Sequence, residues 1–134
     1  MKAKVFVYGT LKKGGRNHHL LENASFVGEA VSLKKYILQG KKHPYPLATP
    51  YGYVQNRVSP ECAGFLAGEI YEMDRKTLKL LDRLEEHPHY YIREKELFRL
   101  IPEGKSVKAF IYHCYHLDLL DDLLVPDGRK IIRW

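Results

Sequence analysis

The sequence is poor in cysteine and has no long apolar run. Its 134 residues include only two cysteines, Cys62 and Cys114, which form no CxxC pair. Such cysteines indicate neither a disulfide framework nor a zinc knuckle. No apolar run approaches the ~18 residues of a membrane-spanning helix. Because Met1–Lys4 leads directly into a strand-like Val5–Val7, without the features of a signal peptide, we expect a cytoplasmic protein with no membrane association.

The chain also lacks any concentration of basic charge. Its 22 lysines and arginines exceed its 16 acidic residues, which gives a net charge of +6. An excess of this kind can attract anions, but nucleic-acid-binding arms usually carry dense basic runs. The basic residues occur instead as scattered pairs: Lys12–Lys13, Lys34–Lys35, Lys41–Lys42 and Arg129–Lys130. This distribution indicates a solvated basic surface and argues against nucleic acid as a partner.

Signatures of cofactor and metal chemistry are missing as well. The sequence has no P-loop, no GxGxxG, no GxSxG elbow and no Ser/His/Asp order. The closest histidine clusters, His87–His89 and His113–His116, lack the third ligand that a zinc site needs. We therefore expect surface histidines, no metal and no cofactor.

What the sequence does contain is a pattern of short strands. With 45% hydrophobic residues and no linker or repeat, it predicts one domain over residues 1–134. Asp74 can cap a helix that runs to about Glu86, where His87-Pro88 ends it. Shorter helices are expected from Asn17 to about Leu21 and over Leu117–Leu124, and residues 51–60 are ambiguous. The predicted strands are Lys4–Tyr8, Ser25–Leu33, Tyr36–Gln39, Phe65–Met73, Tyr90–Ile101 and Val107–Cys114. This pattern favours an α+β fold whose largely antiparallel sheet can curl into a barrel.

Glu85 occupies a position where the main helix should be apolar. It follows Leu81 by four residues and Leu78 by seven, so it lies on the inward face that Leu84 also marks. Glu86, one step further, turns toward solvent as an ordinary surface charge. Burial raises the pKa of a carboxyl toward neutrality, which suits a group that accepts and returns a proton. A buried structural glutamate paired with Arg93 or Arg83 fits the same spacing.

The segment Val5–Leu11 is a second candidate. A strand that ends in Gly9-Thr10 can turn several backbone N–H groups toward one point and form a nest for an anion. A plain tight turn explains the same residues.

Several motifs, taken in order, resemble those of the γ-glutamyl cyclotransferase-like (AIG2-like) family. Phe6-Val7-Tyr8-Gly9-Thr10-Leu11-Lys12 is similar to its YG[S/T]L signature. Its second block is matched by Gly68–Tyr71, Leu81–Glu85, Pro88 and Tyr91–Arg93. Lys42–Leu47 resembles a Tyr-Pro-Leu segment of the γ-glutamylamine cyclotransferase branch. The resemblance covers roughly residues 4 to 113.

The resemblance implies a small mixed barrel flanked by helices, and an intramolecular reaction that needs no cofactor. The α-amine of a small γ-glutamyl substrate attacks its own γ-amide, releasing 5-oxoproline and an amine. The family's catalytic glutamate falls on Glu85. Its substrate-binding loop falls on Tyr8, Gly9, Thr10 and Leu11, and Tyr91 can add a hydroxyl or can simply be a packed aromatic.

The identity of the leaving amine stays open in the sequence. The Tyr45-Pro46-Leu47 segment favours γ-glutamylamines such as γ-glutamyl-ε-lysine over simple γ-glutamyl amino acids and glutathione. The alternative from another class is a non-catalytic small-barrel module that binds an anionic ligand or single-stranded nucleic acid through its ten tyrosines and basic surface. The sequence carries no signal for an oligomeric state, and the tail Arg129–Trp134 can be a lid, a strand or disordered.

Overall fold

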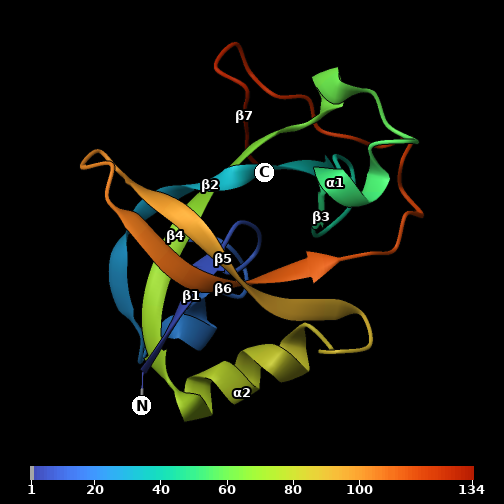
Figure 1. Cartoon of the computed structure of the whole chain (residues 1–134). Coiled ribbons are helices and arrows are strands. Elements are labelled where there is room, and N and C mark those ends of the chain that lie inside the picture. Colours follow the sequence, from blue (N-terminus) through green and yellow to red (C-terminus); the bar gives the residue numbers. More distant parts are fainter. Residues whose placement is uncertain (1) are drawn as a thin grey trace.

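A computed structural model describes residues 2–134 (Figure 1). The strands are β1 (Lys2–Val7), β2 (Ser25–Gln39), β3 (Leu47–Pro50), β4 (Gly64–Asp74), β5 (Tyr91–Ile101), β6 (Ser106–Cys114) and β7 (Ile131–Ile132). The helices are α1 (Tyr51–Val54) and α2 (Arg75–Leu84), with two 3-10 turns, η1 (His18–Leu21) and η2 (Pro60–Cys62). In this described part of the chain, no helix is both long and apolar enough to cross a membrane.

The sheet closes on itself into a barrel. Its seven strands follow the order β3-β2-β5-β6-β1-β4-β7, and an additional pairing of β2 with β4 closes the ring β2-β5-β6-β1-β4. The β1–β6 pair is parallel, while the other pairs in the ring are antiparallel. Closure hides strand edges that would otherwise be open to pairing with other chains. The predicted fold class, a small mixed and largely antiparallel barrel with helices beside it, is confirmed.

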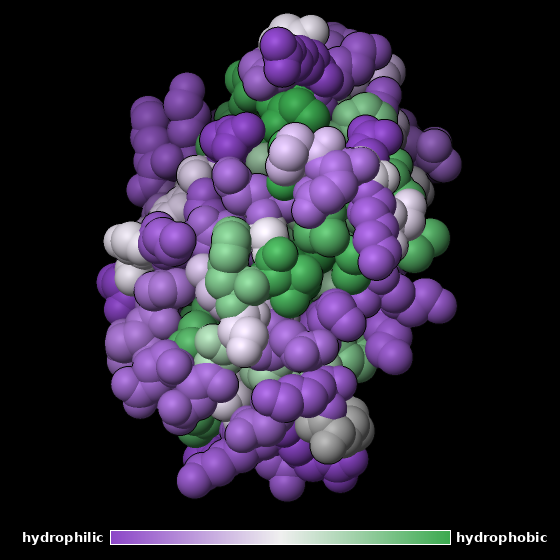
Figure 2. All heavy atoms as spheres, turned by 90° about the vertical axis from the view of Figure 1, so that its left-hand side faces the viewer, coloured by the Kyte–Doolittle hydropathy of each residue, from purple (hydrophilic) through white to green (hydrophobic). Residues whose placement is uncertain are grey.

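Alternation along β1 divides the core into two parts. Phe6 points into the barrel, where its ring stacks on Phe98 with 4.1 Å between centroids. Val5 and Val7 point the other way and pack with Leu78 and Leu81 of α2. This period of two is what a strand buried on both faces requires. Side chains on the outside are mostly polar: Figure 2 shows one face that is largely hydrophilic around a small hydrophobic group.

Two of the predicted secondary-structure assignments differ from the structure. The two strands predicted over residues 25–39 are one, because β2 continues through a register irregularity between Val31 and Lys35. The predicted helix over 117–124 is wrong: this segment is a series of turns fastened to the end of β2. The Leu119 N–H donates to Gln39 Oε1 at 3.0 Å, and the Leu124 N–H donates to the Leu38 carbonyl at 2.9 Å. Its periodic leucines cover Ile37 and Val54 without forming a helix.

The main helix begins as predicted and ends two residues earlier. The Asp74 carboxylate accepts a hydrogen bond from the Thr77 N–H at 2.8 Å, as an N-cap does. At the other end, the His87 N–H donates to the Asp82 carbonyl and the Glu86 N–H to the Arg83 carbonyl. This pair of bonds defines a Schellman motif with Glu86 in the left-handed position, at a φ of 53°. Glu85 is therefore the C-cap residue of α2.

A half-buried ion pair fixes this end of α2 to the barrel. Arg93 of β5 donates from Nε to Asp82 Oδ1 at 2.8 Å and from a terminal nitrogen to Oδ2 at 3.1 Å. The hydroxyl of Tyr112 on β6 donates to the same Oδ1 at 2.7 Å. Burial acts to raise the pKa of Asp82, but these hydrogen bonds outweigh it and hold that pKa below its usual value. The clamp therefore determines where Glu85, three residues further along, enters the structure.

Removing the charge of Asp82 will test the clamp. We expect Asp82→Asn to lower the free energy of unfolding by about 2 kcal/mol, because Arg93 loses its charged, bidentate partner. The matched control is Glu72→Gln, which breaks the exposed Lys4–Glu72 pair at 3.4 Å and should cost below about 1 kcal/mol. Urea unfolding of both variants measures the difference, and equal costs would contradict the role assigned to the clamp.

Among residues 2–134, Glu86 and Lys130 (φ 62°) are the non-glycine residues whose backbone is left-handed. They generate a second prediction. A side chain in this conformation is strained by about 1–2 kcal/mol, and glycine recovers part of it despite its greater freedom in the unfolded chain. We expect Glu86→Gly and Lys130→Gly each to raise the free energy of unfolding by roughly 0.5–1 kcal/mol. Urea or thermal unfolding checks this, and a loss of stability in either variant would show that its side chain stabilises the turn.

Candidate active site

One cavity joins the end of β1 to the end of α2. Its volume is about 260 Å³, and all six residues that the sequence singled out line it: Tyr8, Gly9, Thr10, Leu11, Glu85 and Tyr91. The rest of the wall consists of Phe6, Val7, Arg16, Asn17, Tyr45, Pro46, Leu84, Glu86, Tyr90 and Tyr112. Barrel closure thus brings together segments that lie up to 104 positions apart in the sequence, as in the 2.7 Å bond from the Tyr8 hydroxyl to the Tyr112 carbonyl.

Glu85 projects into this cavity without a partner. The residue is partly buried, and its carboxylate forms no hydrogen bond or ion pair with any residue from 2 to 134. Burial alone raises the pKa of Glu85 to about 7. The alternative of pairing with Arg93 or Arg83 is wrong, because Arg93 pairs with Asp82 instead. Leu84 is 38% exposed, so it marks the cavity's edge rather than the core.

The loop after β1 forms the opposite wall. Gly9 lies against Pro46 so closely that an added Cβ would be 2.8 Å from the proline Cγ and Cδ. The Lys12 N–H donates to the Gly9 carbonyl at 3.1 Å and closes the turn. Within residues 2–134, the N–H groups of Gly9, Thr10 and Leu11 have no acceptor, although all three residues line the cavity. Such unused donors can bind an anion.

Asn17 supports this loop instead of capping a helix. Its backbone N–H donates to the Thr10 carbonyl at 3.0 Å, and its side-chain amide donates to Thr10 Oγ1 at 2.9 Å. Asn17 stands at the N-cap position of η1, as expected, but its side chain forms no capping hydrogen bond there. The amide therefore holds Thr10 in place, a role that residue type and spacing do not reveal.

Two buried tyrosines orient the inner end of the cavity. The Tyr8 hydroxyl donates to the Tyr112 carbonyl, and the Tyr91 hydroxyl donates to the Pro46 carbonyl at 2.7 Å. Burial raises the pKa of both phenols, and the charge of Glu85 raises it further. Both remain neutral. The Tyr8 hydroxyl also accepts a hydrogen bond from the Ala48 N–H at 3.4 Å, whereas the Tyr91 hydroxyl accepts none from residues 2–134 and can accept one from a ligand.

The structure adds wall residues that sequence reasoning missed, above all Tyr45, Pro46 and Tyr90. The rings of Tyr45 and Tyr90 are nearly perpendicular with 6.4 Å between centroids, and Tyr90 also meets Tyr91 edge to face. Tyr45 and Pro46 belong to a segment that drew attention only through its resemblance to one branch of a family. Nothing in the sequence around Pro44 and Pro46 indicates that this loop contacts Gly9.

The histidines do not form a metal site in the described chain. No three His, Cys, Asp or Glu side chains among residues 2–134 converge as a metal would require. His113 is fully buried in β6, with its ring nitrogens 2.8 Å from the Tyr36 hydroxyl and 3.0 Å from Glu94 Oε1. It lies outside the cavity and ties β2, β5 and β6 together.

Comparison with known proteins identifies the fold and the protein family. A family model described as gamma-glutamyl cyclotransferase, AIG2-like, matches residues 5–129. A putative gamma-glutamylcyclotransferase from Methanocaldococcus jannaschii is 38% identical over 109 residues, which span 81% of each chain. Gamma-glutamylaminecyclotransferase C from Danio rerio is 41% identical over 115 residues, 81% of this chain and 72% of the relative.

Among solved structures, an AIG2-like protein from Mus musculus superposes with a TM-score of 0.72 at 28% sequence identity, covering 96% of this chain and 87% of that one. The segment matched by the family model contains the end of β1 from Val5, the loop beyond it, and α2. This chain belongs to the gamma-glutamyl cyclotransferase, AIG2-like family.

Proposed function

We propose that the protein is a cyclotransferase that converts γ-glutamylamines to 5-oxoproline and a free amine, with Glu85 as general acid and base. The observation that carries this proposal is the unpartnered Glu85 carboxylate, which lies in a cavity opposite unused N–H donors. Its pKa is about 7. A group that titrates near neutral pH can take a proton in one step and return it in the next.

The reaction moves two protons from the substrate's α-nitrogen to the leaving nitrogen. Glu85 takes the first from the α-ammonium, and the freed amine attacks the γ-carbonyl carbon to form a five-membered ring. The carbonyl oxygen carries negative charge in the tetrahedral intermediate. When the bond to the leaving nitrogen breaks, protonated Glu85 donates its proton to that nitrogen. The ionised Glu85 then takes the second proton from the ring nitrogen and passes it to the released amine, which departs as an ammonium. No water or cofactor enters, since the nucleophile and electrophile belong to one molecule that the site has only to orient.

The loop after β1 supplies the anion site. The N–H groups of Gly9, Thr10 and Leu11 bind a negative group of the substrate, either its α-carboxylate or the developing oxyanion. The Tyr91 hydroxyl, fixed by its bond to the Pro46 carbonyl, accepts a hydrogen bond from the substrate's ammonium. Asn17 holds Thr10 so that these donors keep one direction.

The wall made by Tyr45, Pro46 and Tyr90 receives the leaving amine. These side chains offer mainly apolar and aromatic surface, which suits an alkyl amine better than the carboxylate next to the amide in a γ-glutamyl amino acid. Relatives from Danio rerio and Bos taurus that carry the name gamma-glutamylaminecyclotransferase support this choice.

We expect Glu85→Gln to lower kcat for 5-oxoproline release by at least about 1,000-fold, because the amide can neither accept nor return a proton. Mass spectrometry of the products from γ-glutamyl-ε-lysine, γ-glutamyl-alanine and glutathione measures the loss and ranks the substrates. The control is Glu103→Gln, an exposed glutamate outside the cavity, which should keep the turnover of the wild type. Equal activity of the wild type and Glu85→Gln would refute the assignment.

The raised pKa of Glu85 predicts a pH dependence of both activity and stability. Because the ionised form is the base, kcat/KM should rise with pH to a plateau with a midpoint near 7. The stability effect has the opposite sign. Folding raises this pKa from 4.5, so the wild type loses stability relative to Glu85→Gln as pH rises from 4.5 to about 7. Urea unfolding at pH 5 and 8 should show a relative loss on the order of 2 kcal/mol.

Gly9→Ala tests the anion site through the contact with Pro46. The added methyl collides with the proline ring, so we expect the loop to shift and kcat/KM to fall by at least about tenfold. A rise in KM alone would assign the N–H groups to the α-carboxylate, whereas a fall in kcat alone would assign them to the oxyanion. Gly52→Ala serves as control, since nothing lies within 4 Å of its added Cβ and its backbone is not left-handed. Unchanged kinetics in Gly9→Ala would remove the loop from the mechanism.

A further inference from the structure

The cavity has a rim that the proposed chemistry leaves unused. Of its lining residues, Arg16, Leu84 and Glu86 are exposed, so they stand where the cavity meets solvent. The Arg16 guanidinium already donates to the Pro44 carbonyl at 2.8 Å. The Glu86 carboxylate, in contrast, has no hydrogen bond or ion pair with residues 2–134. An unpaired carboxylate at the mouth is available to a ligand.

The backbone position of Glu86 is unusual for a charged residue with no structural task. It occupies the left-handed position of the Schellman motif, which glycine fills at least strain. Its carbonyl accepts hydrogen bonds from the His89 N–H at 2.7 Å and the Tyr90 N–H at 2.9 Å, so the backbone at this point is fixed. Backbone strain that a glycine would relieve is typical of functional positions.

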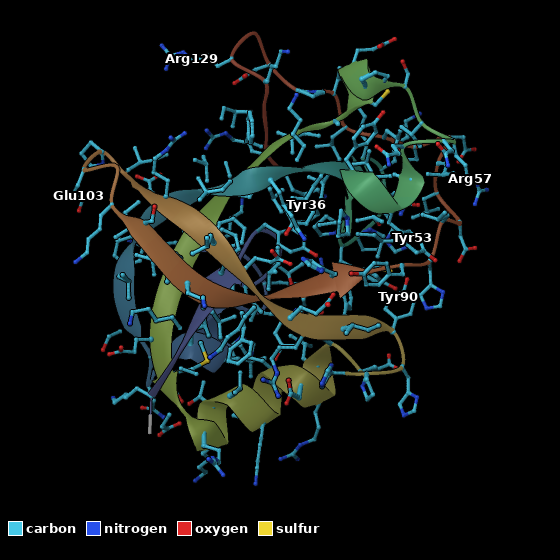
Figure 3. All side chains as sticks on the ribbon, in the orientation of Figure 1. Tyr36, Tyr53, Arg57, Tyr90, Glu103 and Arg129 are labelled. Atoms are coloured by element: carbon cyan, nitrogen blue, oxygen red, sulfur yellow. The ribbon has the colours of Figure 1, made fainter. Side chains whose placement is uncertain are left out.

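The surroundings of Glu86 favour a positive charge. The C-terminal end of α2, which directly precedes it, carries the negative end of the helix dipole. Tyr45 and Tyr90 line the same cavity. One face of Tyr90 is stacked on His116 with 5.1 Å between centroids, and an uncovered tyrosine face attracts ammonium groups. The Tyr90 N–H donates to the Glu86 carbonyl, which fixes Tyr90 near Glu86. Figure 3 shows Tyr90 on the side of the barrel away from Glu103.

We propose that Glu86 selects leaving amines that carry a second, positively charged nitrogen with no carboxylate beside it, such as diamines. The proposal rests on the proposed cyclotransferase function and specifies its substrate class. In the complex, the γ-glutamyl end lies at Glu85 and the loop after β1, the alkyl chain lies along Tyr45 and Tyr90, and the distal ammonium meets Glu86 at the rim.

Three substrates of similar length test this: the mono-γ-glutamyl amides of cadaverine, pentylamine and aminovalerate, whose tails are cationic, neutral and anionic. We expect the wild type to prefer the cadaverine amide over the pentylamine amide by about fivefold in kcat/KM, the range of an exposed ion pair aided by a tyrosine face. Glu86→Gln and Glu86→Gly should both remove this preference and leave the pentylamine amide within about twofold of the wild type.

Two controls match the variants. Glu103→Gln removes an exposed glutamate from the turn between β5 and β6, on the opposite side of the barrel from Tyr90 (Figure 3). Lys130→Gly relieves the same backbone strain as Glu86→Gly at a residue outside the cavity. Both should keep the preference of the wild type. A preference that survives in Glu86→Gln, that is absent from the wild type, or that favours the anionic tail through Arg16 would overturn the proposal.

Binding separates this proposal from the proposed function. Calorimetry of the three amides with the wild type, or with Glu85→Gln where turnover interferes, reports recognition without chemistry. If no amide is turned over but the cadaverine amide binds more tightly and loses this advantage in Glu86→Gln, the reaction is wrong and the role of Glu86 stands. If turnover is normal without charge preference, only the role of Glu86 falls. If there is neither turnover nor binding, both fail.

Discussion

The ion pair between Asp82 and Arg93 is the constraint on which the site depends. It joins the last turn of α2 to β5 and, through the Tyr112 hydroxyl, to β6. The Schellman motif then ends the helix within three residues of the clamp, so the direction of Glu85 is set by hydrogen bonds on both sides. Under the proposed function, a carboxylate that serves one nitrogen and then another needs this fixed origin, since misplacement by about 1 Å lowers rates severely. The two acidic side chains thus differ: Asp82 is paired with Arg93, whereas Glu85 is unpaired within residues 2–134.

That division has an energetic logic. A partly buried carboxylate without a partner destabilises the folded state whenever it is ionised, and the pKa of Glu85 near 7 expresses this cost. A cation beside Glu85 would remove the cost but also lower the pKa and weaken it as a base. Stability comes instead from apolar packing in the core, although Phe6 also borders the cavity. The barrel interior around Phe6 and Phe98 and the packing of Leu78 and Leu81 against β1 contain no unpartnered charge.

The local features of the fold were visible in the sequence, and the long-range ones were not. The Asp74 cap, the side on which Glu85 leaves the helix, and most strands follow from residue types and spacing within a few positions. The pairing of Arg93 could not be predicted, because it depends on how β5 is placed beside α2. The failed helix at 117–124 shows the same limit: its leucine spacing fits a helix, but hydrogen bonds to Gln39 and Leu38 hold the segment in turns. For the cavity, the loop after β1 and Glu85 could be named, yet their opposing wall at Tyr45 and Pro46 exists only because the barrel closes.

Closure also explains why the site lies where it does. Gly9 can touch Pro46 because it has no side chain, and the Tyr91 hydroxyl binds the carbonyl of the same proline from the other side. Pro46 is therefore the point at which the loop after β1 and the start of β5 meet. The turn that follows α2 connects this point to the rim, since the Glu86 carbonyl holds Tyr90, the neighbour of Tyr91. One short segment, from Asp82 to Tyr91, thus contains four features of the site. They are the Asp82 anchor, the Glu85 carboxylate proposed as acid and base, the Glu86 charge at the rim and the Tyr91 hydroxyl at the inner end. A change in its backbone would move all four together, so strain at Glu86 can persist only because the clamp and the Pro46 contact hold the segment at its two ends.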